Sequence, residues 1–280
     1  MSVSNVGAYA EKLKPWLPSD DYHQKHLERF AFSFSRLPQL PKGFSCVSIG
    51  SWGSDAPYIS EVLGASRIAC VRAPEAGVPD VDVRTIRASA STRDTRVEVY
   101  AVNAERDPLP QALRDFDLCI SWEILEHLSH DPCFFVWQAI QTLKLGGYLS
   151  LTTPNALWHY LTTAQLFGEN ALGLRLQPHI PFATHWRLYS PKEVGQLATR
   201  MGCEQRLLTT FLESEPFSLK SRVYLSLVEY FRRHSGNGAM TVGKLIYFLG
   251  QKKTVEPLWR PEWLFPSTAR QWKELSNKTA

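Results

Sequence analysis

The sequence has 280 residues, of which 44% are hydrophobic and 21% are charged, a composition that excludes global disorder and is ordinary for a globular protein. This length allows one large domain with insertions, or a domain and a small appendage. The 31 basic and 27 acidic residues leave a net charge of +4, which is too small to indicate nucleic-acid binding, so we expect no nucleic-acid partner.

The cysteines and the hydrophobic segments indicate in which cellular compartment the protein is expected. The five cysteines form no CxxC pair, and several lie in apolar segments, as is typical of buried thiols in a reducing environment. The segment MSVSNVGAYAEKLKPWLP lacks the apolar core of a signal peptide, and eighteen consecutive apolar residues occur nowhere. These patterns predict a cytoplasmic protein.

The N-terminal part predicts helical structure and then the first strand. Residues 1–20 mix small polar residues, lysines and prolines, and we expect them to pack loosely over the domain. Residues 22–37 have apolar positions at helical spacing and predict one helix. Residues 44–49 predict the first core strand, which the loop 50–55 joins to a helix at 57–63.

Gly50 directly follows the first predicted strand. A glycine there lets the backbone approach a ligand, and the helix after it offers unpaired N–H groups. The alternative is a simple glycine turn between a strand and a helix. Residues 67–72 predict a second strand that ends in Arg72. Residues 96–102 predict a third strand, after a polar segment at 75–96 that we expect to form loops around a weak element.

The middle of the chain predicts a strand, a helix and a strand in succession. Residues 118–122 form a short apolar run that ends in Glu123, which is typical of a buried strand. Asp131 followed by Pro132 is an N-cap with proline at the first helical position. Residues 148–153 are rich in β-forming residues and predict the next strand. This order indicates a right-handed crossover in a parallel sheet.

Polar residues follow three of these predicted strands, at 103–105, 121–127 and 152–155. In open α/β sheets ligands bind beyond the carboxyl ends of the strands. We therefore expect these three segments to converge on one site.

The C-terminal half predicts further α/β elements. Residues 156–167 predict a helix, and the irregular polar segment 168–189 is long enough to line an acceptor site. The capping box SPKE then begins a well-marked helix. A strand at 204–211, a helix at 219–233 and a last strand at 242–251 complete the predicted elements.

Several motifs carry a family resemblance. The segments DLCISWEILEHL, LKLGG and LTTPN resemble the strand-four, pre-strand-five and strand-five elements of class I S-adenosylmethionine-dependent methyltransferases. The segments NAERDPLP, HWRLYSPKEV and RPEWLF look closest to the branch associated with surface-polysaccharide biosynthesis. The resemblance implies an α/β fold with a doubly wound, seven-stranded, mostly parallel Rossmann-like sheet, in the order 3-2-1-4-5-7-6, with an antiparallel last strand.

The resemblance also implies a domain organisation. Residues 1–40 would form an N-terminal helical lid, and residues 41–253 would form the methyltransferase domain with an acceptor-side insertion at about 168–189. Residues 254–280 would form an aromatic C-terminal tail packed on the domain.

The cofactor that the resemblance implies is S-adenosyl-L-methionine. The positions that match its binding elements are Gly50, Ser51, Trp52, Arg72, Asn103, Ala104, Glu105, Ser121 and Trp122. The sequence departs from the family pattern at Ser48, Trp52 and Ser54, and Arg72 stands where relatives have an acidic residue. An arginine has only donors, so it cannot accept hydrogen bonds from the ribose hydroxyls, although Glu75 lies close enough in the chain to replace that function.

Methyl transfer to oxygen requires a base near the acceptor hydroxyl. The predicted catalytic residues are His127, His185 and Glu123, and Glu126 is a further candidate base. For His127 the alternative is a structural histidine that caps a turn. For His185 the alternative is an ordinary surface loop.

The acceptor side is predicted from the same resemblance and from donor-rich side chains. The residues expected to bind the acceptor are Asn155, His185, Arg187 and Tyr189. No HxxxH or paired-aspartate spacing occurs, so no metal site is predicted. A GxSxG elbow and a GxGxxG loop are also absent, which argues against a serine hydrolase and a nicotinamide dehydrogenase.

We therefore predict methyl transfer to a hydroxyl of a glycan or other sugar-containing small-molecule acceptor. One alternative is a methyltransferase for a small secondary metabolite, and another is a non-catalytic binding protein with the methyltransferase fold. The basic ends and apolar stripe of residues 219–233 suggest a weak membrane-surface association, although such a stripe more commonly packs on a sheet. The sequence makes no prediction of the oligomeric state.

Overall fold

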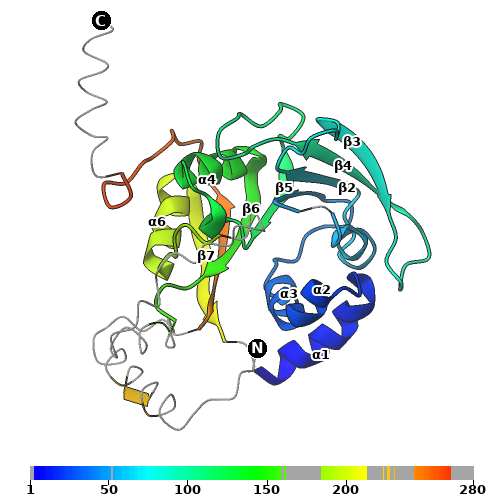
Figure 1. Cartoon of the computed structure of the whole chain (residues 1–280), viewed down its shortest axis with the longest axis horizontal. Coiled ribbons are helices and arrows are strands. Elements are labelled where there is room, and N and C mark those ends of the chain that lie inside the picture. Colours follow the sequence, from blue (N-terminus) through cyan, green and yellow to red (C-terminus); the bar gives the residue numbers. More distant parts are fainter. Residues whose placement is uncertain are drawn as a thin grey trace, which may run out of the picture.

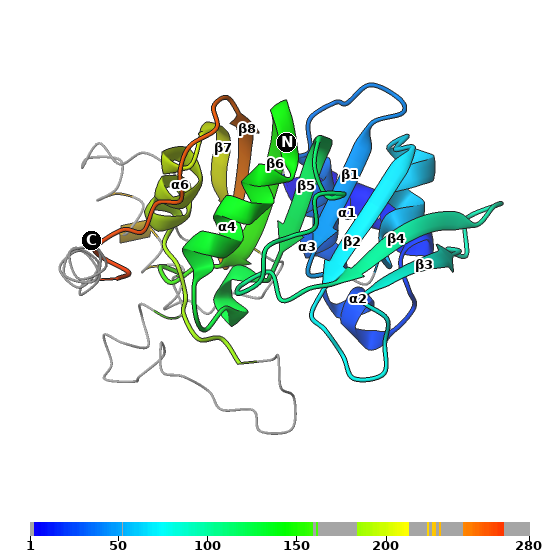
Figure 2. The same cartoon turned by 90° about the horizontal axis from the view of Figure 1, so that it is seen from above.

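The computed structural model describes residues 3–51, 53–158, 184–212 and 243–265, together with residues 161, 223, 226, 227 and 230. Its centre is an eight-stranded sheet, around which Figure 1 shows the helices. The strand order is β3-β4-β2-β1-β5-β6-β8-β7 (Figure 2). In chain order the strands are β1 (Ser45–Ile49), β2 (Arg67–Arg72), β3 (Val81–Ile86), β4 (Thr95–Ala101), β5 (Phe116–Trp122), β6 (Leu143–Pro154), β7 (Cys203–Phe211) and β8 (Leu245–Lys252).

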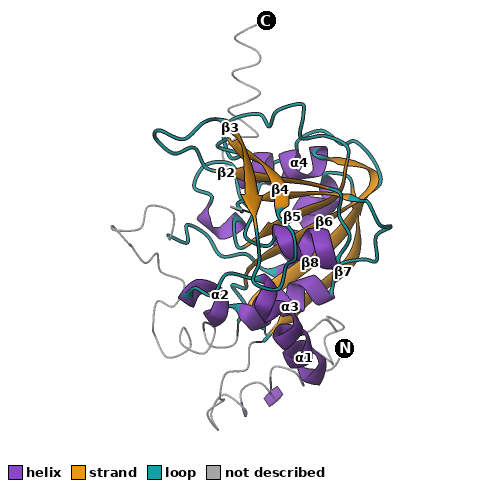
Figure 3. Ribbon diagram, turned by 90° about the vertical axis from the view of Figure 1, so that its right-hand side faces the viewer, coloured by secondary structure: helices purple, strands orange, loops and turns teal. Residues whose placement is uncertain are grey.

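Helices lie on both faces of this sheet (Figures 2 and 3). The helices are α1 (Val3–Leu13), α2 (Asp21–Lys25), α3 (Leu27–Ser35), α4 (Pro132–Gln141) and α6 (Pro191–Arg200). Three short helical turns complete the described elements, and they are η1 (Lys14–Trp16), η2 (Tyr58–Val62) and η3 (Leu125–His127).

The parallel core of the sheet is confirmed, but its strand count is not seven. The pairs β1 with β2, β1 with β5, β2 with β4, and β5 with β6 are all parallel. The strand β8 is antiparallel to both β6 and β7, which is the antiparallel last strand that the sequence predicts. The order from β4 to β7 matches the predicted one, and β3 adds an antiparallel edge strand. This strand lies where loops were expected, because its residues alternate between exposed and half-buried and form no apolar face.

The sheet is buried on both sides. On one face, Phe135 and Val136 of α4 and Leu197 of α6 pack in a core with strand residues such as Leu149. On the other face, helices α1 and α3 cover the sheet in a second core. Figure 2 shows the two helical layers on opposite sides of the strands. All five cysteines are buried as free thiols, as the sequence predicts.

The N-terminal segment packs more tightly than the sequence predicts. Val6, Ala10, Leu13 and Leu17 are all buried, so the expectation of loose packing for the first twenty residues is wrong. Their spacing is helical, but small residues such as Gly7 and Ala8 and the nearby Pro15 and Pro18 weaken the helical pattern of this segment. The single helix predicted for residues 22–37 is instead two helices, α2 and α3, which meet at His26.

Two helix starts are confirmed by their capping contacts. The Asp131 carboxylate accepts a hydrogen bond from the Phe134 N–H at 3.0 Å, at the start of α4. Ser190 and Glu193 form the predicted reciprocal capping box at the start of α6. The helix α4 ends at Gln141, because the residues after Thr142 already belong to β6.

Several predicted segments lie largely or wholly outside the described residues. They are the helix at 156–167, most of the segment 168–189, the helix at 219–233 and the tail beyond residue 265. Within 219–233, the described side chains Val223 and Leu227 are each more than half exposed. No helix among the described residues combines the length and the apolar character needed to cross a bilayer.

Candidate functional site

A cavity of about 290 Å³ lies at the carboxyl ends of the central strands. Its floor comes from the ends of β1, β5 and β6, and its roof comes from α2 and α3. The lining residues include Gly50, Ser51, Ser54, Asp55, Trp122, Glu123 and Thr152 of the floor and Tyr22, His23, Arg29, Phe30 and Ser33 of the roof. The cavity is therefore where the parallel sheet places a ligand site.

The loop after β1 holds its shape through internal polar contacts. The Ser51 hydroxyl accepts a hydrogen bond from the Gly53 N–H at 2.9 Å and donates one to the Asp55 carboxylate at 3.2 Å. Gly50 has φ +90°, and a Cβ added there would lie 2.1 Å from Cδ1 of Ile124. The glycine is thus required by its backbone conformation and by the close approach of Ile124. Trp52 lies outside the described residues.

Asp55 is a buried carboxyl at the cavity wall. Burial raises its pKa above the ordinary value of 3.8. The folded state therefore holds this proton more tightly than the unfolded state does. Its contribution to stability is fully present below pH 3.8 and is lost as the pH rises through the folded-state pKa.

We expect the Asp55→Asn variant to be more stable than the wild type at neutral pH, because it removes a buried charge. The difference in unfolding free energy should shrink as the pH falls toward 3.8, since both chains then carry a neutral group. Urea denaturation from pH 4 to 7 measures this difference. Asp80→Asn, at an exposed carboxyl, is the control. A difference in unfolding free energy that stays constant with pH would contradict the raised pKa of Asp55.

The roof of the cavity is tied to its floor by an ion pair. Nη1 of Arg29 donates to Oε2 of Glu123 at 2.9 Å, and both side chains are largely buried, with exposed fractions of 13% and 12%. Nη2 of Arg29 also donates to the Tyr22 hydroxyl at 3.0 Å. Glu123 has φ +57°, a conformation that a non-glycine residue adopts at some energetic cost. Of this group only Glu123 is a residue predicted from the sequence.

A second contact between roof and floor involves His23. Its ring stacks on Phe30 with 5.6 Å between the centroids, and its Nε2 lies 3.1 Å from the Ser54 hydroxyl oxygen. The Asp20 carboxylate contacts Nδ1 of the same ring at 2.8 Å. The short helix α2 is thus connected to the loop after β1 through polar side chains.

The two residues predicted at the end of β5 face opposite ways. Trp122 lines the cavity, donates its Nε1–H to the Ser150 hydroxyl at 2.9 Å and contacts Phe34 edge to face. Ser121 is buried and does not line the cavity, and its hydroxyl has no hydrogen-bond partner among the described residues. Only Trp122 is therefore placed to contact a ligand in the cavity.

Arg72 does not line the cavity. Its side chain is 2% exposed, its Nη1 donates to the Ala73 carbonyl at 3.1 Å, and the Glu75 carboxylate lies 3.9 Å away. The Glu75 side chain itself is mostly exposed. The end of β2 thus presents a buried cation instead of the carboxylate expected from the family pattern.

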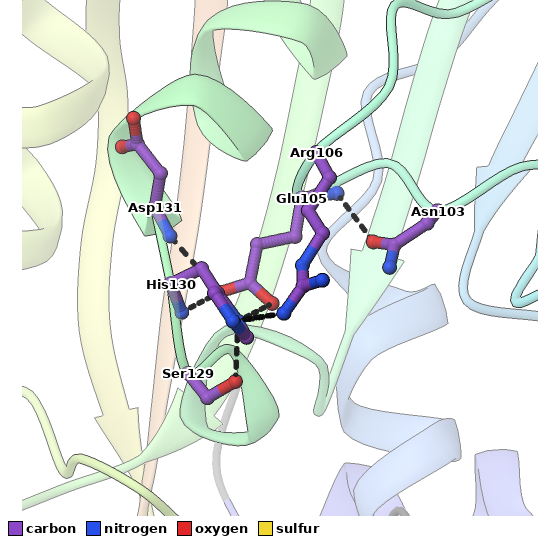
Figure 4. A network of polar contacts seen from close by, with 6 residues as sticks. All are labelled: Asn103, Glu105, Arg106, Ser129, His130 and Asp131. Atoms are coloured by element: carbon purple, nitrogen blue, oxygen red, sulfur yellow. Dashed lines mark hydrogen bonds and ion pairs between the residues drawn. The ribbon is translucent and has the colours of Figure 1, made fainter.

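Residues 103–105 belong to a network that joins the end of β4 to the start of α4 (Figure 4). The Glu105 carboxylate accepts hydrogen bonds from the N–H groups of His130 and Asp131, the latter at 3.0 Å. The Asn103 amide oxygen accepts from the Glu105 N–H at 3.2 Å, and the Ala104 carbonyl accepts from the Gln138 amide. These polar groups are engaged with one another and with α4 and the residues before it, and none of the three residues lines the cavity.

A second polar cluster, which we call the Glu–His–His cluster, consists of Glu126, His127 and His185. One oxygen or nitrogen atom from each lies within 4.8 Å of those of the other two. The Glu126 carboxylate accepts a hydrogen bond from the Thr153 hydroxyl at 2.9 Å, next to the cavity-lining Thr152. The two imidazole rings meet edge to face with centroids 4.9 Å apart. The structure thus brings both predicted catalytic histidines together.

Burial sets the protonation of this cluster. It raises the pKa of the Glu126 carboxyl well above its ordinary value, and the nearby Glu123 carboxylate raises it further. Burial lowers the pKa of His127 to about 4, and it also lowers the pKa of His185. Both imidazoles are therefore neutral at pH 7.

The other predicted acceptor residues serve the packing of the fold. Tyr189 is fully buried in the core below α6, so it cannot face an acceptor as expected. Asn155 is also buried, donating to the Gly243 carbonyl at 2.7 Å. Arg187 bonds Glu193 at 2.7 Å and stacks over the rings of Tyr189 and Trp263. Of the predicted acceptor residues, only His185 lies in the Glu–His–His cluster.

The chain is similar to known proteins at the level of its fold. No protein-family model and no curated protein matches the sequence. Among solved structures, the chain is similar to one from a complex of the Haloferax volcanii Trm112 methyltransferase activator with a methyltransferase, at 14% identity and a TM-score of 0.54. The match covers 89% of this chain and 98% of that one.

A second similar structure is an S-adenosylmethionine-dependent methyltransferase from Listeria monocytogenes. It is 11% identical with a TM-score of 0.50, and the match covers 80% of this chain and 98% of that one. The parallel order from β4 to β6 and the antiparallel β8 are thus part of an arrangement shared over most of the chain. The chain has the class I fold of the S-adenosylmethionine-dependent methyltransferases.

Proposed function

We propose that the chain transfers a methyl group from S-adenosylmethionine to a hydroxyl group of a glycan or other sugar-containing acceptor. The observation that carries this proposal is the cavity at the carboxyl ends of β1, β5 and β6, within a fold shared with methyltransferases. A volume of about 290 Å³ is close to the lower end of small-molecule sites, which span roughly 300–1,000 Å³.

In the proposed reaction the acceptor oxygen attacks the methyl carbon of the sulfonium. The S–CH₃ bond breaks with its electron pair left on sulfur, which yields S-adenosylhomocysteine, and the hydroxyl proton passes to a base. His127, His185 and Glu123 are the proposed bases, and the two neutral imidazoles can accept a proton at pH 7. A positioned base contributes a rate factor of about 10² to 10⁴.

The acceptor is proposed to lie beside His185. Trp186 is 53% exposed next to it, and an exposed indole face suits the apolar C–H face of a sugar ring. The likeness of the HWRLYSPKEV segment to the polysaccharide branch supports the same acceptor class.

A non-catalytic binding protein is the second candidate function. It is favoured by the burial of Arg72 at the end of β2 and by the hydrogen bonds that engage residues 103–105 with one another and with the start of α4. A protein of this kind would have no site for the cofactor ribose and adenine, so a binding measurement separates the two candidates.

Calorimetric titration of the purified chain with S-adenosylmethionine and S-adenosylhomocysteine tests the proposal. We expect saturable binding of both compounds. The Ser54→Leu variant places a larger side chain at the cavity wall and should weaken binding by about tenfold or more, which corresponds to roughly 1.4 kcal/mol.

Ser89→Leu is the matched control, because it also removes one serine hydrogen bond but lies outside the cavity. Its affinity should equal that of the wild type. If folded wild-type protein binds neither compound, the methyltransferase proposal is wrong and the second candidate is favoured. Equal losses of affinity in the Ser54→Leu and Ser89→Leu variants would show that the cavity is not the cofactor site.

A further inference from the structure

We propose that the Glu–His–His cluster, formed by Glu126, His127 and His185, binds a divalent transition-metal ion, for which Zn²⁺ is the best match. Two imidazoles and one carboxylate are a ligand set that such ions take in catalytic sites with an open coordination position. The three donor atoms already lie within 4.8 Å of one another, and Oε1 of Glu126 is 3.7 Å from Nε2 of His127. Ligand atoms around one Zn²⁺ lie about 3.3 Å apart, so small side-chain shifts complete the site.

The hydrogen bonding of His127 prepares the ring as a ligand. Its Nδ1 lies 3.2 Å from the carbonyl oxygen of Thr184. A carbonyl oxygen can only accept, so Nδ1 is the donor and Nε2 is the nitrogen left to bind an ion. Nε2 is also the atom that lies 3.7 Å from Glu126. A backbone carbonyl commonly fixes a metal-binding histidine in this way.

The burial of Glu126 also favours a cation at the cluster. The side chain is 1% exposed, and a buried carboxylate requires an opposing charge or neutralisation by a proton. Its carboxylate contacts the Thr153 hydroxyl and lies 3.7 Å from the His127 ring. The cation Arg29 forms its ion pair with Glu123. A divalent ion would supply the missing positive charge.

The third ligand, His185, is held in place by the backbone on either side of it. The Thr184 carbonyl accepts from His127, and the Trp186 N–H donates to the Glu126 carbonyl at 2.7 Å. A parallel bridge between Asn155 and Tyr189 fixes the same segment against the end of β6. Main-chain hydrogen bonds therefore hold the His185 segment against Glu126 and His127.

The ion would act in the proposed methyl transfer, and this part of the inference rests on that function. Three protein ligands leave at least one coordination position, which the acceptor hydroxyl oxygen can occupy. Coordination would hold that oxygen in position and lower the pKa of its proton. With both histidines bound to the ion, the proton passes to the Glu123 carboxylate beside the cluster.

Metal binding can be measured on the metal-free protein with no cofactor or acceptor present. Equilibrium dialysis with Zn²⁺ should give one equivalent bound per chain, and Mg²⁺ should compete poorly, because imidazole ligands favour transition metals. His127→Ala and His185→Ala should each weaken Zn²⁺ binding by roughly 100-fold or more. Even the loss of a partner that only orients a ligand changes affinity by about 10- to 100-fold.

His130→Ala is the matched control, since this half-exposed histidine contacts Ser129 and lies outside the cluster. It should bind Zn²⁺ as the wild type does. No stoichiometric binding, a preference for Mg²⁺, or equal losses in all three variants would overturn the proposal. If a variant fails to fold, Co²⁺ bound to the wild type decides: strong visible absorption of four- or five-coordinate cobalt supports the site, and the weak spectrum of the hydrated ion contradicts it.

The outcome is independent of the cofactor measurement. Zn²⁺ binding without S-adenosylmethionine binding would leave the metal site standing and remove the proposed function. Binding of S-adenosylmethionine without binding of Zn²⁺ would leave the proposed function standing and remove the metal site.

Discussion

The Gly50→Ala variant is expected to lose about 3 kcal/mol of unfolding free energy. A left-handed backbone conformation costs a residue with a Cβ about 1–2 kcal/mol, and Gly50 has φ +90°. The added Cβ would also lie 2.1 Å from Cδ1 of Ile124, and overpacking of this kind costs about 1–3 kcal/mol. Urea denaturation followed by circular dichroism measures the loss.

Gly43→Ala is the control for the conformational part, because Gly43 has φ +87° and no atom within 4 Å of an added Cβ. It should lose only about 1–2 kcal/mol. The double variant Gly50→Ala/Ile124→Ala should recover the packing part of the loss relative to Ile124→Ala alone. Equal losses at Gly43 and Gly50, or no coupling with Ile124, would show that the close approach is not what requires a glycine.

The Arg29→Met variant is expected to lose about 3 kcal/mol, because it leaves the Glu123 carboxylate buried without its guanidinium. Removing one partner of a buried ion pair costs about 3–5 kcal/mol of unfolding free energy. The side chains of Arg29 and Glu123 are 13% and 12% exposed, so we expect a loss at the lower end of that range. The same variant should weaken cofactor binding, since Arg29 lines the cavity. Denaturation and calorimetry on one preparation measure both effects.

The double variant Arg29→Met/Glu123→Gln should recover much of the stability, because neither charge remains buried. Arg206→Met is the matched control, since its guanidinium bonds the exposed Glu204 at 3.0 Å. A surface pair of this kind contributes about 0–1 kcal/mol. A loss at Arg29 no larger than the loss at Arg206 would contradict the role assigned to the buried pair.

The central strand, helix and strand could be predicted from the sequence because each has a local marker. The apolar run of β5 ends abruptly in Glu123, and α4 begins with Asp131 followed by Pro132. The edge strand β3 has no such marker, because its position depends on pairing with β4. The buried face of α1 also lacks a clear marker, since small residues such as Gly7 and Ala8 weaken the contrast between its two faces.

The residues of the candidate site could be predicted from the sequence only where they lie at the ends of predicted strands. Gly50 and Trp122 line the cavity because each lies at the end of a parallel strand. Arg29 was not predictable, because nothing local indicates which helix residue will reach a carboxylate on a distant loop. Tyr189 was expected to bind the acceptor but is buried in the core. The sequence alone does not show which side chains near His185 turn into the core.

The division of the roof into α2 and α3 has a consequence for how a ligand reaches the cavity. The helix α3 is anchored by four buried residues, whereas α2 has none. Displacing α2 therefore breaks polar contacts such as those of His23 with Ser54 and of the Tyr22 hydroxyl with Arg29, and it exposes little apolar surface. Ligand exchange can then proceed without disturbing the hydrophobic layer beneath α3.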